Sequence, residues 1–510
     1  MKRREFIKFL SATAASAGWA GCTRSEEPLT RSGEPPNIVF LFSDQLSANV
    51  LSASGGRNIS TPHLDRVAAQ GISFRNGLST CPLCAPYRGM LMTGRYPTHS
   101  GVLLNRINVS PQQNPQCLAN VFGAAGYDTG FLGKWHLSAG VKAVTQKVDR
   151  HGQSMAEYKR KNPHLEFTPP GPDRLGFRHW EAYNYHTDFN HYWFFRDTPE
   201  RIVAEGYETD VLIDQAIAYM QRRRDSDRPF LLVIASHPPH PPYHPAKCPT
   251  GYLERIRKQL HWSPNVPKLP PEEKSKLNFD LRCYYAMAKH LDDGVGRLVA
   301  YLDQSGLAER TLFVFTSDHG EMSASHGLFG KMFPYEESVN VPLLMRWPGQ
   351  IPAGTRSDVL YTPMDHLPTL CSVSGIPIPD MVDGVDLSSV LQGDRVVERD
   401  AVLMMSYVAG YSNFRTDKPQ PEWRAVRTDR HTYIKWIRGN EALFDNVDDR
   451  YQLRNLVDHR RHQAKLNHLR DRLKDLLAEA HDEFLPGTAY ADWYDNERNL
   501  IRTALGEVPG

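Results

Sequence analysis

Four short apolar runs in this chain each end on a cluster of polar residues. The runs occupy residues 38–42, 130–132, 230–235 and 312–316. Near-continuous apolar segments of this length are typical of strands that are buried on both faces of a parallel sheet. In such a sheet a ligand binds beyond the carboxyl ends of the strands. The pattern therefore predicts an α/β body in which the four polar clusters converge on one site.

Helix-like segments alternate with these runs. Amphipathic stretches span residues 207–223 and 284–304, and a charged stretch spans about 461–481. The last follows two short segments, 424–435 and 441–445, that favour antiparallel strands. We therefore predict an α/β fold with a largely parallel sheet sandwiched by helices, and a smaller C-terminal α+β subdomain that carries an antiparallel sheet.

The main body is predicted over residues 37–384 and the C-terminal subdomain over 385–510. Between about 139 and 197 the alternation of strands and helices is lost, and the segment is rich in His, Tyr and Pro. Long irregular insertions near a site often shape the access of its ligand. We therefore expect this insertion to border the site.

The N-terminal residues 1–22 differ from the body. A basic segment, 2–4, precedes a short apolar stretch and a run of small residues that ends at Cys22. This order is typical of a twin-arginine export signal, and residues 19–22 resemble a lipobox, which would place a lipid anchor on Cys22. The alternative is a plain signal peptide in which Cys22 is incidental. Residues 23–36 are polar and predict a flexible tether.

Export through the twin-arginine translocase would make this a periplasmic or membrane-anchored lipoprotein of a bacterium. The balance of 60 Lys and Arg against 58 Asp and Glu gives a net charge of +2, and no long basic stripe lies in the body. Charge therefore gives no support for nucleic-acid binding. The chain has seven cysteines, too few for a disulfide scaffold in 510 residues. The fold must rest on its hydrophobic core.

The segment with the most chemical information is residues 84–88 (CAPYR), followed by 93–95 (TGR). Pro86 suits the first turn of a helix, where its missing N–H is not needed. Cys84 would then lie just before the helix N-terminus, whose free N–H groups favour an anion. Arg88 would return to the same side about one turn later.

Cys84 has other interpretations. With Cys81 it forms a Cys-x-x-Cys sequence, which is also found in redox pairs of the thioredoxin type and in halves of metal sites. No second cysteine pair is present to complete a zinc site, and the chain is far longer than a redox domain. A purely structural Cys84 is the third possibility.

The Cys-x-Pro-x-Arg segment with its downstream Thr-Gly-Arg resembles the activation signature of the type I, formylglycine-dependent sulfatases of the alkaline phosphatase superfamily. The resemblance runs in motif order from Asn37 to about Gly384, and residues 441–445 are similar to a C-terminal element of the family. It implies an alkaline-phosphatase-like fold and the oxidation of Cys84 to 3-oxoalanine (formylglycine) by a formylglycine-generating enzyme. The hydrate of that aldehyde would supply the hydroxyl group that attacks sulfur.

Two polar clusters after the strand-like runs contain candidate metal ligands. A single Asp after a strand is usually a turn former or a helix cap, but two such clusters in one sheet favour a shared metal site. The resemblance implies that they bind a divalent cation, most often Ca²⁺, together with the converted Cys84. Oxygen atoms suit this hard cation and the imidazole of His319 suits it least. The metal candidates are Asp44, Gln45, Cys84, Asp318 and His319.

The resemblance also implies catalytic roles for basic residues near the other strand ends. Lys134 and Lys331 would hold oxygens of the sulfate group, as would Arg88. His136 would act as a base, and His240 would protonate the leaving oxygen. Taken singly, such residues are more often ordinary loop residues. Weaker candidates for substrate contact are His237 and His326.

The sequence therefore predicts a sulfatase, a hydrolase of sulfate esters, that acts mainly by positioning and by preorganised charge. The insertion rich in Tyr and His favours a polar, sugar-like substrate, either a sulfated small molecule or a glycan. One alternative is a phosphonate monoester or phosphodiester hydrolase of the same superfamily. Another is a non-catalytic lipoprotein that binds sulfated glycans.

Overall fold

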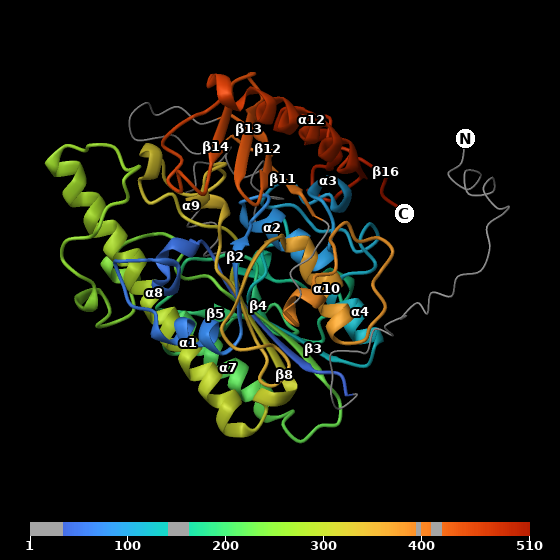
Figure 1. Ribbon diagram of the computed structural model, residues 1–510. Coiled ribbons are helices and arrows are strands. Elements are labelled where there is room, and N and C mark those ends of the chain that lie inside the picture. The colour runs from blue at the N-terminus through green and yellow to red at the C-terminus, as the bar shows by residue number, and fades with distance from the viewer. Residues whose placement is uncertain (1–33, 141–162, 394–398, 410–420, 510) are drawn as a thin grey trace, which may run out of the picture.

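The computed structural model describes residues 34–140, 163–393, 399–409 and 421–509 (Figure 1). The predicted export signal, with Cys22, and most of the predicted tether lie outside the described residues. Within them, no helix is both long enough and apolar enough to cross a membrane. An eight-stranded sheet runs through the body and helices cover both of its faces (Figure 1). This confirms the predicted α/β fold.

The sheet is parallel except for one strand. Strand β9 pairs in the antiparallel sense with both of its neighbours, whereas every other pairing in the sheet is parallel. The order across the sheet is β10 (Thr355–Tyr361), β2 (Ile72–Gly77), β9 (Leu343–Arg346), β8 (Thr311–Ser317), β1 (Asn37–Ser43), β7 (Phe230–Ser236), β3 (Asp128–Lys134) and β4 (His179–Tyr183).

The four predicted strands are the adjacent strands β8, β1, β7 and β3, and all but the first residue of β3 are buried. Alternate side chains of β1 enter two separate cores, Phe40 and Phe42 on one face and Val39 and Leu41 on the other. The strands also end level with one another, since Ser43 pairs with both Ser236 and Ser317. Level, parallel ends place the residues that follow each strand at one edge of the sheet.

Helices complete the two cores. The predicted amphipathic segments are confirmed as α7 and α8, although α8 begins earlier than expected. Pro271 occupies its first turn, and Glu272 and Glu273 follow, an arrangement that favours a helix N-terminus. One face of the sheet carries α1 (Pro62–Gln70), α7 (Glu208–Gln221) and α8 (Pro271–Ser305), and the other carries α2 (Cys84–Thr93), α4 (Leu118–Ala124) and α10 (His366–Val373) (Figure 1).

The C-terminal part contains the predicted antiparallel sheet and charged helix. Four strands pair in sequence order, and α12 (Gln463–Glu479) packs on the first three of them. The strands are β11 (Ala401–Ser406), β12 (Trp423–Thr428), β13 (His431–Trp436) and β14 (Glu441–Asp445). The short elements are α3 (Pro97–Ser100), α9 (Glu336–Val339), α11 (Ser388–Leu391), β5 (Trp193–Phe194), β6 (Ile202–Val203), β15 (Arg502–Thr503) and β16 (Gly506–Glu507).

The predicted insertion at 139–197 contains an unexpected strand. Strand β4 extends the main sheet beside β3, and the pairing continues past the end of β3. There the backbone N–H of His136 donates to the carbonyl of Asn184 over 3.1 Å. The described end of the insertion therefore lies against the edge of the sheet where the strand ends meet.

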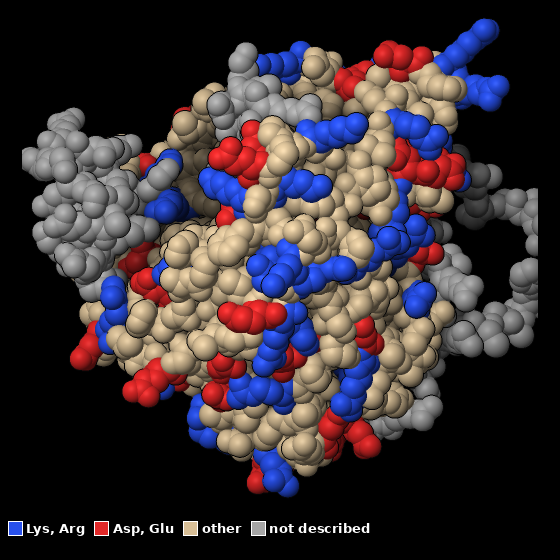
Figure 2. Space-filling view, turned by 90° about the vertical axis from the view of Figure 1, so that its left-hand side faces the viewer, with Lys and Arg blue, Asp and Glu red and all other residues tan. Residues whose placement is uncertain are grey.

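Positive and negative side chains are interspersed on the side of the molecule that carries α8 (Figure 2).

Candidate active site

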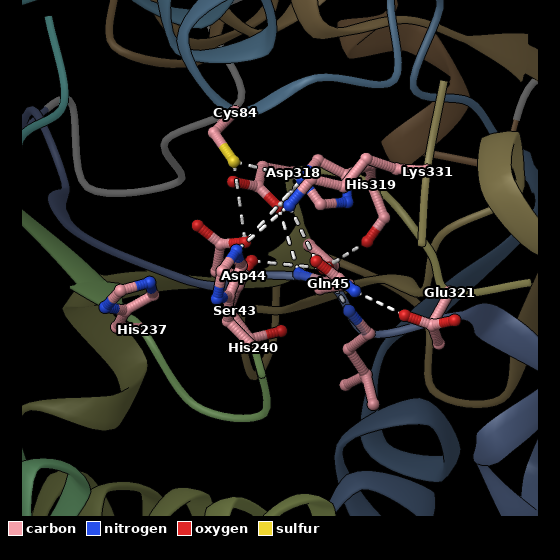
Figure 3. A network of polar contacts seen from close by, with 12 residues as sticks. Ser43, Asp44, Gln45, Cys84, His237, His240, Asp318, His319, Glu321 and Lys331 are labelled. Carbon is pink, nitrogen blue, oxygen red and sulfur yellow. Dashed lines mark hydrogen bonds and ion pairs between the residues drawn. The ribbon is translucent and has the colours of Figure 1, made fainter. Parts of the chain in front are cut away.

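Residues that follow β1, β7 and β8 meet at the carboxyl edge of the sheet, and Cys84 approaches them from α2 (Figure 3). Lys134, the last residue of β3, joins the same group through Asp44. We call the charged and nucleophilic members the strand-end cluster. Each of them is buried in the structure. The cluster consists of Asp44, Cys84, Arg88, Lys134, Asp318, His319 and Lys331.

The backbone is unusual where the strands end. Gln45 and His136 have positive φ angles of 72° and 56°, a conformation that non-glycine residues adopt rarely and mostly at functional sites. Gly133 has φ 93°, and a Cβ atom there would lie 2.3 Å from the carbonyl oxygen of Ala235 on the neighbouring strand. The glycine therefore allows the end of β3 to approach β7 closely and places Lys134 in the cluster.

Cys84 is the first residue of α2, and Leu83 is the N-cap. It thus lies one position farther into the helix than the sequence predicted. Its Sγ atom lies 3.3 Å from Nε2 of His319 and 3.7 Å from Oδ1 of Asp44. Burial and Asp44 raise the pKa of the thiol, but the positive charges of Lys134 and the residues around it outweigh them and lower it. The side chain at position 84 therefore points into a site that favours an anion.

Two carboxylates anchor the candidate metal site. Ligand atoms of Asp44, Cys84, Asp318 and His319 all lie within 4.8 Å of one another. Both carboxylates are completely buried, and buried carboxylates require a cation nearby. Gln45 lies beside them, since its backbone N–H donates to Oδ1 of Asp318 over 3.1 Å, and its side chain carries a further oxygen. This set of oxygen donors fits a hard divalent cation.

Arg88 and Lys134 approach the carboxylates from the other side. An Arg88 NH2 atom lies 3.3 Å from both Asp44 and Asp318, and Nζ of Lys134 lies 2.5 Å from Asp44. Burial opposes ionisation of Asp44, but Lys134 and the neighbouring cations hold its pKa well below the usual range. The predicted helical geometry is confirmed here, because Arg88 reaches the cluster one turn after Cys84.

His240 and Lys331 form a second pair of contacts. Nζ of Lys331 lies 2.7 Å from Oε1 of Gln45 and 3.0 Å from Nε2 of His240. The other ring nitrogen of His240 lies 2.7 Å from the carbonyl oxygen of Pro241, so Nδ1 carries the proton and Nε2 accepts from Lys331. Burial and the charge of Lys331 hold the pKa of His240 well below its usual value. His240 is therefore neutral in this arrangement.

His237 supports Lys134. Its Nε2 atom lies 3.1 Å from Nζ of Lys134, and its backbone N–H donates to Glu208. His237 is completely buried and Glu208 likewise. Burial raises the pKa of Glu208 to about 7. The hydrogen bonds from Tyr183 and His237 favour the anion and oppose this rise, but burial outweighs them. His237, predicted as a substrate contact, thus lies behind Lys134 in the structure.

His136 lies beside the cluster with an open ring nitrogen. Its Nδ1 atom is buried and has no hydrogen-bond partner among the described residues. Burial, together with the charges of Lys134 and Arg88, holds the pKa of His136 well below its usual value. A neutral imidazole with an unoccupied nitrogen can accept a proton, as the predicted role requires.

Glu321 belongs to the site, although the sequence interpretation did not include it. One of its carboxylate oxygens accepts from Nε2 of Gln45 and from the hydroxyl of Tyr243, and the other accepts from the backbone N–H groups of Ser323 and Gly330. Glu321 thereby orients the amide of Gln45 so that its oxygen faces Lys331 (Figure 3). The sequence feature that could have indicated this role is the position of Glu321, three residues after Asp318.

His326, predicted as a weaker substrate contact, and Cys81, of the alternative redox pair, both lie outside the strand-end cluster, and the role of His326 stays a prediction. His326 bonds to Asn265 over 3.2 Å and stacks on Tyr335, and among the described residues no hydrogen bond joins it to the strand-end cluster. Burial raises the pKa of the Cys81 thiol to about 12. Because the thiolate is the reactive form, this environment disfavours a redox role for Cys81 with Cys84.

Comparison with known proteins gives the family. The sulfatase family model matches residues 36–376, and a second model, described as the C-terminal part of N-sulphoglucosamine sulphohydrolase, matches residues 324–479. The chain is 33% identical to an ulvan-active sulfatase of Formosa agariphila over 485 residues, which cover 93% of this chain and 88% of that protein.

Two other similarities agree. The chain is 28% identical to an endo-4-O-sulfatase of Bacteroides thetaiotaomicron over 86% of this chain and 90% of that protein. A solved structure from the same species, described under the metabolism of multiple glycosaminoglycans, is 26% identical, has a TM-score of 0.76 and covers 90% of this chain and 98% of its own. The chain therefore belongs to the sulfatase family of alkaline-phosphatase-like fold and is a hydrolase of sulfuric esters.

Proposed function

We propose that this sulfatase removes sulfate from a carbohydrate, with formylglycine derived from Cys84 as its nucleophile and a divalent cation, Ca²⁺ above all, in the adjacent site. The observation that carries the proposal is the position of Cys84. Its side chain enters the one group of described residues where two buried carboxylates, Asp44 and Asp318, meet the buried cations Arg88 and Lys134.

The proposal needs two groups beyond the side chains of the chain. Formylglycine at position 84 would supply, as its hydrate, a hydroxyl group as the nucleophile toward sulfur, and a cation held by Asp44, Gln45 and Asp318 would supply positive charge for an anionic oxygen. His319 borders this cation site and is its least suitable ligand, because a hard cation prefers oxygen.

The basic side chains bind the sulfate group. Lys134 and Lys331 reach the cluster from two different directions, through contacts with Asp44 and with Gln45. Their positive charges would lie against the sulfate oxygens, with Arg88 behind them. Preorganised charge of this kind stabilises the negative charge that develops as the ester bond breaks. Because the site is buried, each interaction is stronger than it would be in water.

Two histidines move the proton. An anionic sulfate ester beside His240 favours the protonated imidazole, because a nearby negative charge raises a histidine pKa. Nε2 of His240, which accepts from Lys331 in the structure, would then donate to the leaving oxygen. His136, with its unoccupied Nδ1, would take the proton from the second hydroxyl at position 84 as the C–O bond to the transferred sulfate breaks, which would release sulfate and regenerate the aldehyde.

A carbohydrate substrate has support from the relatives. The names of two of them refer to ulvan and to endo-acting removal of 4-O-sulfate. Export by the twin-arginine translocase, with Cys22 as a lipid anchor, would place the enzyme in the periplasm, where such glycans are met. This translocase carries folded proteins, so a formylglycine-generating enzyme would act on Cys84 before export.

The test is sulfate release compared with phosphodiester cleavage. We expect kcat/KM to be higher for sulfated saccharides and an aryl sulfate than for an aryl phosphodiester or a phosphonate monoester, and Cys84→Ser to abolish turnover of all four. Cys248→Ser, also at a buried cysteine, is the matched control and should retain activity. Faster cleavage of the phosphorus esters would identify the enzyme as a phosphonate or phosphodiester hydrolase, and binding of sulfated glycans without release would identify a binding protein.

A further inference from the structure

Two half-buried side chains, Arg106 and Tyr185, lie between the strand-end cluster and solvent. The Arg106 guanidinium lies 5.4 Å from the centre of the Tyr185 ring. The same ring lies 4.9 Å from Nζ of Lys134 and 5.0 Å from the ring of His136. The pair therefore borders Lys134 and His136, beside the position that the proposed function gives to the sulfate group.

Arg106 is held at this position by anchors on both sides of it in the chain. The side chain of Asn105 accepts from the backbone N–H of Ala85, the residue after Cys84, over 2.9 Å. The side chain of Asn108 accepts from the N–H of Ala139 over 2.8 Å, in the loop that follows β3. Arg106 itself has a positive φ of 64°. The loop thus fixes the arginine relative to both Cys84 and His136.

Tyr185 is fixed by the extension of β4. The preceding residue, Asn184, accepts a backbone hydrogen bond from His136, and the N–H of Tyr185 donates to Glu166 over 3.0 Å. The ring is therefore placed by the same backbone pairing that places His136. It also lies 5.4 Å from the ring of His237 and 6.3 Å from that of His240.

Apart from the Tyr185 ring, the charge of Arg106 has no partner among the described residues. No described carboxylate lies within ion-pair distance of it, and no described residue accepts a hydrogen bond from it, in contrast to Arg88 in the cluster. A half-buried guanidinium held beside a site in this way is suited to a planar or tetrahedral anion on a ligand.

We propose that Arg106 and Tyr185 form a binding site for a second anionic group on the substrate, so that the enzyme selects sulfated saccharides that carry a carboxylate or another sulfate on the same or the neighbouring sugar. The Tyr185 ring would pack against the face of the sugar, and Arg106 would bind the second anion. This inference rests on the proposed function, because it assumes that the sulfate to be removed occupies the site beside Lys134.

The test compares saccharides that differ only in the second anion. The carboxyl groups of sulfated oligosaccharides that contain uronic acid are reduced chemically, which gives neutral sugars with the same sulfates. A neutral oligosaccharide with one sulfate and its disulfated form make the second pair. We expect the wild-type enzyme to prefer the member with the additional anion in at least one pair, and the preferred pair identifies that anion.

In the variant Arg106→Gln the KM for the preferred saccharide should rise about tenfold to a hundredfold, which is the usual worth of a hydrogen bond to a charged group. Its kcat and its KM for the neutral partner should change little. Tyr185→Phe should retain most of the activity, whereas Tyr185→Ala should raise KM for both members. The control is Arg438→Gln, at an exposed arginine in the turn between β13 and β14.

Equal loss in Arg106→Gln for both members of each pair would overturn the inference while leaving the sulfatase mechanism intact. A wild-type enzyme that favours the member without the additional anion in both pairs would also overturn it. Failure of the wild-type enzyme to release sulfate from any saccharide would instead contradict the proposed function.

Discussion

The molecule contains two buried groups of opposite charges that are built differently. In the C-terminal part, Arg424 and Asp482 form a one-to-one pair in which each side chain is fully buried. Both oxygens of Asp482 accept hydrogen bonds, from Arg424 and from the hydroxyls of Tyr407 and Tyr490. The remaining guanidinium nitrogen of Arg424 donates to the carbonyl of Ser406 over 2.9 Å. Every polar atom of this pair has a partner.

The strand-end cluster is different because its charges are shared and its hydrogen bonds are incomplete. Asp44 contacts both Arg88 and Lys134, and Arg88 contacts two carboxylates. Among the described residues, Nε of Arg88 in the cluster and Nδ1 of the adjacent His136 and His237 are buried without a partner. A saturated pair can only hold the fold together, whereas unsaturated groups remain available to a substrate, a cation or a proton. The difference separates stability from function, and four substitutions test it.

The largest effect on stability is expected for Asp482→Asn. It leaves the charge of Arg424 buried without its counter-ion, which costs about 3–5 kcal/mol in the free energy of unfolding. Thermal or denaturant unfolding of the purified variant measures this, and the folded fraction should keep its kcat. The control is Asp475→Asn on the exposed side of α12, which should shift stability by less than about 0.5 kcal/mol. A stable Asp482→Asn variant would show that the saturated pair is not structural.

For Lys134→Met we expect the reverse of Asp482→Asn, namely a large loss of activity with a smaller loss of stability. Sulfate release should fall about 100-fold to 1,000-fold, because a charge aimed at the reacting group is lost. Stability should change less than in Asp482→Asn, since Asp44 retains its contact with Arg88. Steady-state kinetics and unfolding are measured on the same preparation, with Lys435→Met at an exposed lysine as the control. Unfolding as severe as that of Asp482→Asn would remove the contrast between the two groups.

A smaller effect is expected for Glu321→Gln, which changes a residue behind the cation site. The new amide can no longer accept hydrogen bonds with both ends, so the Gln45 amide loses its fixed orientation. Residues that orient metal ligands typically contribute 10-fold to 100-fold in metal affinity. Titration of Ca²⁺ into chelator-treated enzyme should show a loss of about this size, with activity recovering at higher Ca²⁺. The control Glu309→Gln should leave the Ca²⁺ dependence unchanged. The same result for Glu321→Gln would show that Glu321 does not orient a ligand of the cation.

The smallest effect concerns pH and Glu208. Burial raises its pKa from 4.5 to about 7, so between these values the folded state binds more protons than the unfolded state. The free energy of unfolding therefore falls as pH rises through this window, by at most about 1.4 kcal/mol per pH unit for one proton. Glu208→Gln should make stability less dependent on pH between about 5 and 7, as measured by unfolding at several pH values. An identical slope in wild type and variant would contradict the assignment.

The sequence predicted the adjacent strands β8, β1, β7 and β3 better than the rest of the sheet. Strands β1, β7 and β8 are continuous apolar runs because both of their faces are buried. Strand β10 alternates between exposed and half-buried residues over most of its length, and β9 has four residues, so neither stood out from the surrounding loops. The antiparallel direction of β9 depends on how the chain returns, which a local pattern does not record.

The same limit applies to the site. Cys84, Arg88 and Asp44 belong to short motifs that can be read along the chain, and the structure brings them together. Arg106 and Tyr185 belong to no motif, since they meet only because two loops are anchored beside the end of β3. The sequence could therefore indicate the chemistry at sulfur, but the residues that surround the rest of a substrate emerge only from the fold.

The central claim is that the unsaturated cluster holds an aldehyde at position 84. Mass spectrometry of the peptide that contains Cys84, taken from enzyme whose sulfate release has been measured, tests it most directly. The account predicts the mass of formylglycine at position 84 in the active fraction, together with unmodified Cys81 in the same peptide. An unmodified thiol at position 84 in fully active enzyme would contradict it.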